Sequence, residues 1–150
     1  MIRIARTTSA DQDFLTLVKM LDDELWQIYP EIQHLYAEHA RIDFVDTVVI
    51  LYFNEQPVAC GCFLTHDKER VEIKRMFVHS QYRGKGFATT VLKELEQWAR
   101  ELGYTNSILE TGHKQPEAIN LYARSGYQLT NKFGPYVDLE DSLCFIKPLA

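Results

Sequence analysis

The segment 81–88 combines glycine and positive charge in the way an anion-binding loop does. Gly84 and Gly86 let the main chain approach a ligand closely, and Arg83 and Lys85 supply charge. The segment follows a predicted strand and precedes a predicted long helix, whose first amide groups lack internal partners and carry partial positive charge. The spacing therefore predicts a diphosphate site at the mouth of this helix. The P-loop and dinucleotide-binding fingerprints, which also hold phosphates, are both absent.

Three charged side chains, Glu72, Lys74 and Arg75, interrupt the apolar run that precedes this loop. Alternation along a strand places Glu72 on one face with Lys74 and Met76, and Val71, Ile73, Arg75 and Phe77 on the other. Buried charges need partners or a watery cavity. The pattern therefore indicates either an internal ion pair or a carboxylate that takes part in proton transfer.

The elements that must position these groups follow from the hydrophobic periodicity. In chain order we expect a strand at 2–5, a helix capped by Ser9 and broken at Tyr29-Pro30, a shorter helical piece at 31–39, strands at 47–53, 58–65 and 71–78, a helix from 88 closed by Gly103, a strand at 107–110, a helix at 116–125, and strands at 127–129 and 142–146. No linker or repeat interrupts this order, so residues 1–150 are expected to form a single α/β domain.

Composition excludes several classes of protein. A net charge of −5 over 150 residues argues against a nucleic-acid binder, which would present a basic face. Cys60, Cys62 and Cys144 have no disulfide-framework spacing, and the first two are better explained as small buried residues than as metal ligands. No apolar run is long enough to span a bilayer, and residues 1–6 do not resemble a signal peptide. We therefore expect a cytoplasmic protein with no membrane partner.

Two motifs resemble signatures of one family. Gln81-Tyr82-Arg83-Gly84-Lys85-Gly86 is similar to the Gln/Arg-x-x-Gly-x-Gly/Ala signature of the GNAT superfamily of acyl-CoA-dependent N-acetyltransferases, and 121–127 resembles that superfamily's Leu-Tyr-x-x-x-Gly-Phe/Tyr. The order of elements is also the superfamily's order over nearly the whole chain. The resemblance implies a three-layer α-β-α fold whose mixed, mostly antiparallel central sheet is splayed between its fourth and fifth strands.

The resemblance also implies a co-substrate, acetyl-CoA, and no metal. The main chain of Arg83, Gly84, Lys85, Gly86, Phe87 and Ala88 would hold the pyrophosphate. The pantetheine arm would pair with Met76, Phe77 and Val78, and the N–H near Phe77 would polarise the thioester carbonyl. Gln115 stands where the superfamily often has an asparagine that contacts CoA. Because Gln has the same amide on a longer arm, the geometry of that contact is in doubt.

Acetyl transfer to an amine requires two proton transfers: the amine must lose a proton, and the departing thiolate must gain one. An alkylamine has a pKa of about 10.4, so only about one molecule in a few thousand is neutral at pH 7, and a general base is valuable. Glu72 is the first candidate, Glu110 the second, and a water chain the third, while His113 either relays protons or is solvated. Tyr122 matches the tyrosine that commonly protonates the departing thiolate in the superfamily, the alternative being a ring packed on the core.

The acceptor is expected to be a primary amine on a small molecule, an amino acid or a peptide. Asp22, Asp23, Glu24 and Glu31 could attract a cationic amine, whereas Lys74 and Arg75 could hold a carboxylate, and the sequence does not choose. The one protein partner considered, apart from a peptide acceptor, is a second copy of the chain in a homodimer. Two alternatives stay open, a CoA-binding regulatory module without catalysis and an interaction domain without CoA affinity.

Overall fold

The computed structural model describes residues 1–30 and 44–149. Within these residues seven strands form one sheet in the order β1-β2-β3-β4-β5-β7-β6. The elements are β1 (Ile2–Thr7), α1 (Gln12–Ile28), β2 (Val48–Phe53), β3 (Gln56–Thr65), β4 (Arg70–Val78), η1 (Ser80–Tyr82), α3 (Phe87–Glu101), β5 (Asn106–Gly112), α4 (Pro116–Arg124), β6 (Gln128–Thr130), η2 (Gly134–Asp138) and β7 (Ser142–Pro148).

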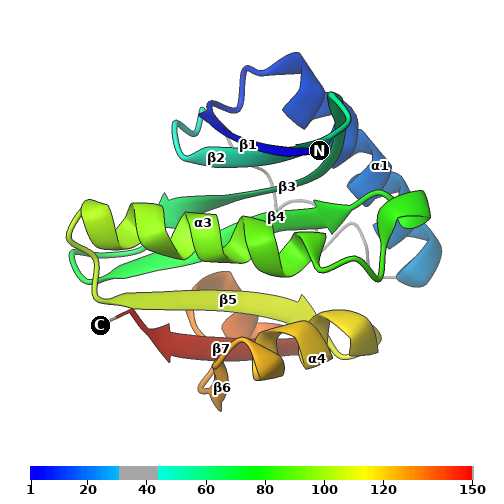
Figure 1. The fold of residues 1–150 in the computed structure, drawn as a ribbon. Coiled ribbons are helices and arrows are strands. Elements are labelled where there is room, and N and C mark those ends of the chain that lie inside the picture. The colour runs from blue at the N-terminus through cyan, green and yellow to red at the C-terminus, as the bar shows by residue number, and fades with distance from the viewer. Residues whose placement is uncertain (31–43, 150) are drawn as a thin grey trace.

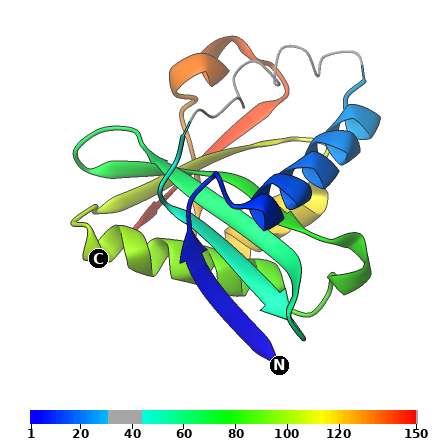
Figure 2. The ribbon, with the colours of Figure 1, turned by 90° about the horizontal axis from the view of Figure 1, so that it is seen from above.

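Helices cover both faces of the sheet. α3 and α4 lie on one face, and α1 lies on the other together with η2 (Figures 1 and 2). Two apolar cores result: Val49 and Leu51 of β2 pack toward α3, while Val48 and Ile50 of the same strand pack toward α1. Both faces of β2 are thus buried, and this explains why the strand is a continuous apolar run. The three-layer α/β architecture expected from the sequence is confirmed.

The fourth and fifth strands separate partway along their length. β4 and β5 are the parallel pair in this sheet, and the other neighbouring strands are antiparallel. Their pairing runs from Arg70 opposite Asn106 to Ile73 opposite Leu109 and stops there, although both strands continue. Figure 1 shows them diverging at the end where α4 begins. The predicted splay is confirmed, and it opens the sheet at the place where the signature loop arrives.

The first helix begins later than predicted. Asp11, not Ser9, is the N-cap residue, and its Oδ1 accepts from the N–H of Asp13 at 2.9 Å. The Ser9 hydroxyl oxygen instead accepts from the N–H of Val45 at 2.8 Å. The helix ends at Ile28, as the Tyr29-Pro30 pair predicted. The helical piece predicted at 31–39 lies outside the described residues.

A β-bulge in β4 changes which side chains share a face. Arg75 has φ of 60°, and the register between β3 and β4 shifts by one residue there. Ile73 and Met76 consequently pack toward α3, while Phe77 packs in the core beneath α1. The prediction that Met76 shares a face with Glu72 and that Phe77 opposes it was wrong. Strict alternation assumed an unbroken strand, and the extra residue reverses the order beyond it.

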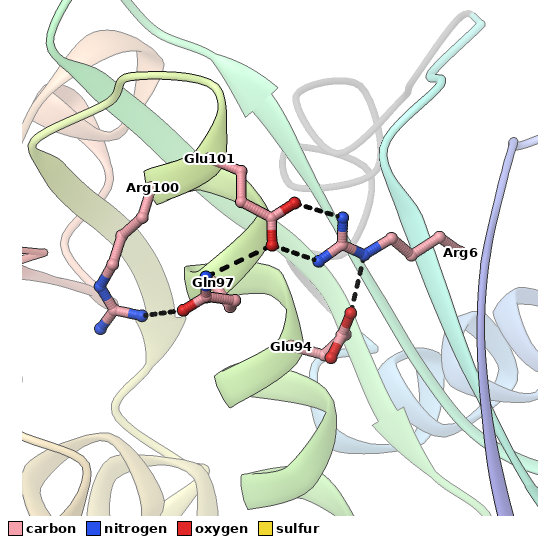
Figure 3. Close-up of polar contacts among 5 residues, drawn as sticks. All are labelled: Arg6, Glu94, Gln97, Arg100 and Glu101. Carbon is pink, nitrogen blue, oxygen red and sulfur yellow. Dashed lines mark hydrogen bonds and ion pairs between the residues drawn. The ribbon is translucent and has the colours of Figure 1, made fainter.

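The edge strand β1 is fastened to α3 by a charged network (Figure 3). The Arg6 guanidinium lies 2.7 Å from Glu94 and 2.8 Å from Glu101, and its carbon lies 4.8 Å from the centre of the Trp98 ring. Three residues on one helix face thus hold the arginine, which links the first strand to the helix that carries the signature loop.

Two further predictions concern individual residues and spans. All three cysteines are buried free thiols, and burial raises the pKa of Cys62 to about 12, so the prediction of small core residues is confirmed for Cys60 and Cys62. No helix in the described ranges is both long enough and apolar enough to cross a membrane.

Candidate active site

The signature loop delivers an uncapped helix N-terminus to the splayed end of the sheet. Gly86 is the N-cap residue of α3 with φ of 80°, and no side chain bonds to the helix's first amides from this position. Gly84 has φ of 82°, and nothing lies within 4 Å of where a Cβ would sit on either glycine. Both residues need the left-handed conformation that glycine adopts without strain. The amides are therefore available to an anion that approaches the loop.

A cleft of about 490 Å³ lies in front of this helix end. Its walls come from α1, the end of β4, the signature loop and α4. Nine residues predicted to contact the coenzyme line it: Met76, Phe77, Val78, Arg83, Gly84, Gly86, Phe87, Ala88 and Gln115. Tyr122 lines it as well, whereas Lys85 does not. The structure thus brings residues from positions 76 to 122 together around one opening.

Arg83 joins the loop to two other walls of the cleft. Its Nε donates to the carbonyl oxygen of Val78 at 2.8 Å, and its Nη2 lies 2.7 Å from a Glu24 oxygen on α1. The guanidinium also stands 5.5 Å from the centre of the Phe77 ring. These contacts fix the loop between β4 and α1.

The charges considered for acceptor binding largely neutralise one another. Asp22 lies 2.6 Å from Arg75, and Glu24 lies 2.7 Å from Arg83. The acidic residues of α1 thus stabilise basic residues of β4 and the loop in ion pairs. These two ion pairs therefore indicate neither a cationic nor an anionic acceptor.

Tyr122 is buried in the α3-side core yet borders the cleft. Its side chain is 6% exposed, and its ring contacts the rings of Tyr127 and Phe145. Among the described residues its hydroxyl makes no hydrogen bond. Burial, and secondarily the nearby Glu110, raise its pKa well above the usual value. The phenol therefore keeps its proton at neutral pH.

Glu72 is held in a polar cluster on the α1 side of the sheet. The Tyr136 hydroxyl donates to its Oε2 at 2.8 Å, and the Lys74 ammonium lies 3.9 Å from the same oxygen. Lys74 in turn donates to the Tyr136 hydroxyl at 3.1 Å. Neither Glu72 nor Glu110 is among the residues that line the cleft. The internal ion pair predicted as one explanation of this carboxylate is present.

Glu110 lies on the same face at the end of β5. Its Oε2 accepts from the Ser142 hydroxyl at 2.7 Å. Burial raises the pKa of this carboxyl to about 7; the Ser142 hydrogen bond and the Lys74 charge oppose the rise, and the Glu72 charge adds to it. His113, the proposed relay, lies at the surface 3.0 Å from Asp141. In the part of the chain that the structure describes, no group of three His, Cys, Asp or Glu is placed to hold a metal ion.

Sequence reasoning missed how three residues serve this site. The Tyr136 side chain bridges Glu72 and Lys74. The sequence indicated only the start of a strand at Ser142, and only a helix end at Tyr29. The Tyr29 hydroxyl accepts from the N–H of Lys114 at 3.0 Å and so ties α1 to the turn before α4. The sequence offered one signal for these three roles: each residue is an aromatic or hydroxyl residue at or near the end of a helix or strand.

The amino-acid sequence is similar to a known family and to a known relative. The sequence model of the Acetyltransferase (GNAT) family matches residues 14–127. An IAA acetyltransferase of Azospirillum brasilense is 31% identical over 150 residues, covering 99% of this chain and 98% of that protein.

Solved structures share the fold over the whole chain. A protein from Klebsiella pneumoniae assigned as an acyl-CoA N-acyltransferase superposes with a TM-score of 0.82 at 27% identity, covering 100% of this chain and 99% of that one. The PaiA N-acetyltransferase of Thermoplasma acidophilum, solved in complex with coenzyme A, has a TM-score of 0.73 at 13% identity and covers 99% of both chains.

Proposed function

The chain belongs to the GNAT family of acetyltransferases, and we propose that it moves the acetyl group of acetyl-CoA directly to a primary amine on a small molecule, an amino acid or a peptide. The observation that carries this proposal is the cleft that joins the end of β4, the N-terminus of α3 and Tyr122. The cleft combines an anion site, an open strand end and a proton donor, which are the parts that such a transfer needs.

The residues present fit coenzyme A. The open space at Gly84 and Gly86 and the free helix N-terminus suit a diphosphate. The unpaired end of β4, at Met76 to Val78, suits an amide-bearing arm that adds to the sheet as a strand would. The coenzyme would supply an activated thioester, and the protein would supply orientation. In this proposal Lys85 adds positive charge at the loop without lining the cleft.

Tyr122 acts as the general acid. A phenol is protonated at neutral pH, and the place of Tyr122 in the cleft wall would let it give that proton to a departing thiolate. The main-chain N–H near Phe77 would stabilise negative charge on the thioester oxygen. A carboxylate, Glu72 or Glu110, would take the proton that the amine must lose before it attacks.

The proposal can be tested in two steps. Calorimetry should show that the wild-type chain binds acetyl-CoA, and binding should raise the melting temperature in proportion to the logarithm of ligand concentration. Thiol release from acetyl-CoA should then depend on an added amine when a panel of amines is screened. Binding without turnover on any amine would favour a regulatory CoA-binding module, and absence of binding would leave an interaction domain.

A further inference from the structure

Two carboxylates stand on either side of the point where β4 and β5 part. Glu72 is opposite Ile108 inside the paired segment. Lys74 and Glu110 are the first residues of their strands beyond the last pair, Ile73 with Leu109. Glu110 therefore lies at the opening of the sheet, whereas Glu72 lies where the strands are still closed together.

The surroundings of Glu72 hold its side chain in place. Its Oε2 is hydrogen-bonded by the Tyr136 hydroxyl, and Lys74 contacts both the carboxylate and that hydroxyl. Both partners fix the Glu72 side chain within the part of β4 that is still paired with β5. Glu72 consequently has the surroundings of a positioning residue.

The surroundings of Glu110 differ in kind. Its direct partner is the neutral Ser142 hydroxyl, and among the described residues it forms no ion pair. Titratable groups face it from β4, β7, η2, α4 and the end of α1: Glu72, Lys74, Cys144, Tyr136, Tyr122 and Tyr29. Its burial raises its pKa to about 7. The carboxyl can therefore gain and lose a proton near neutral pH, as a general base must.

The negative charge of Glu110 also acts on the proposed acid, Tyr122. Glu110 is the one charged group whose field contributes to the raised pKa of Tyr122 among the described residues. A base and an acid that act on the same transfer must both reach the reacting centre, which in the proposed transfer would lie where β4 and β5 part.

We propose that Glu110, rather than Glu72, accepts the proton of the amine, and that Glu72 is a positioning residue held by Tyr136 and Lys74. This inference rests on the proposed acetyl transfer. An alkylammonium gives one proton to Glu110, and the neutral nitrogen forms a bond with the acetyl carbon while the carbon–sulfur bond breaks. Tyr122 gives a proton to the sulfur, and the second proton of the nitrogen restores the phenol.

The pH dependence of kcat/KM separates the two carboxylates in matched variants. Glu110→Gln keeps the Ser142 hydrogen bond but should lower kcat/KM about 100-fold or more and abolish the inflection near pH 7. Glu72→Gln keeps an acceptor for Tyr136 and should lower the rate far less. Because it removes a nearby negative charge, it should move the inflection to lower pH by about one unit. A loss in Glu72→Gln equal to that in Glu110→Gln, or an unmoved inflection, would overturn the proposal.

A second measurement does not depend on turnover. The side-chain carboxyls of the wild-type protein, labelled with 13C at glutamate, should include one resonance that titrates near pH 7 in an NMR series. That resonance should disappear in Glu110→Gln and titrate at lower pH in Glu72→Gln. If the resonance disappears in Glu72→Gln instead, the carboxyl that titrates near pH 7 is Glu72 and the proposal is wrong. Lack of turnover on every amine would instead count against acetyl transfer itself, so the two failures can be told apart.

Discussion

The hydroxyl of Tyr29 fills the space in which a side chain on Gly112 would begin. The same hydroxyl accepts from the N–H of Lys114, whose ammonium lies 5.6 Å from the centre of the Tyr29 ring. This close approach joins the end of α1 to the end of β5. Because Ile28 and Lys114 both line the cleft, the contact sets the distance between two of its walls.

Replacing Gly112 with alanine should therefore damage both stability and cofactor binding. The added methyl group cannot coexist with the Tyr29 ring in its present place, so we expect a loss of about 1–3 kcal/mol in the free energy of unfolding. Acetyl-CoA affinity measured by calorimetry should fall as α1 moves. Tyr29→Phe is the control, since it keeps the ring and removes the hydroxyl with its hydrogen bonds, at about 1–2 kcal/mol. Adding Tyr29→Leu to Gly112→Ala should restore part of the stability, and no rescue would contradict the steric explanation.

Gly86 and Gly103 offer a matched pair for the diphosphate site. They flank the two ends of α3, have φ of 80° and 94°, and have nothing within 4 Å of the point where a Cβ would sit. Alanine at either should cost about 1–2 kcal/mol of stability, because both residues are left-handed. Gly86→Ala should in addition weaken acetyl-CoA binding about tenfold or more, and Gly103→Ala should not. Equal affinities of the two variants in calorimetry would exclude the loop as the cradle.

Substitutions of Tyr122 and Tyr127 by phenylalanine should affect different properties, turnover in the first case and stability in the second. The Tyr122 hydroxyl makes no hydrogen bond within the described residues, so Tyr122→Phe should change the free energy of unfolding by less than about 1 kcal/mol. It should lower kcat about 100-fold with little change in acetyl-CoA affinity. Tyr127→Phe removes a buried hydroxyl that donates to Glu96, so it should lose about 1–3 kcal/mol of stability and keep its turnover. If kcat is unaltered in Tyr122→Phe, Tyr122 is not the general acid.

The pKa of Glu110 also predicts how stability depends on pH. The carboxyl has a pKa of about 7 in the folded chain and an ordinary pKa of 4.5 when unfolded, so between these values the folded state binds more protons. Stability contributed by this group is therefore present below pH 4.5 and is lost as pH rises to 7. Relative to wild type, Glu110→Gln should gain up to about 3 kcal/mol by about pH 8 and nothing at about pH 4. Urea denaturation at both pH values measures the difference, and equal gains at both would contradict it.

The sequence predicted the elements and their order because these depend on local patterns. Helical spacing located α3, and Gly103 and Gly126 adopt the left-handed conformation expected beyond helix ends. Alternation and turn residues located the strands of the meander. The residues at 76–78 and 83–88 were also predicted from the resemblance, since they lie close together in the chain, and eight of these nine line one cleft.

Long-range relationships could not be predicted in the same way. Insertion of β7 between β5 and β6 brings Ser142 to Glu110, and η2 brings Tyr136 to Glu72, across separations of 32 and 64 residues. The bulge at Arg75 reverses the faces of Met76 and Phe77, which alternation alone assigned wrongly.

The amino-acid sequence by itself determined the fold class, the glycine-rich loop before α3 and the tyrosine of the second motif, because each is encoded by side chains close together in the chain. The tertiary structure alone decided which carboxylate is paired and which is buried beside a neutral partner. The hydroxyl partners of the two carboxylates, Tyr136 for Glu72 and Ser142 for Glu110, come from residues far away in the sequence, and only the folding of the chain brings them together.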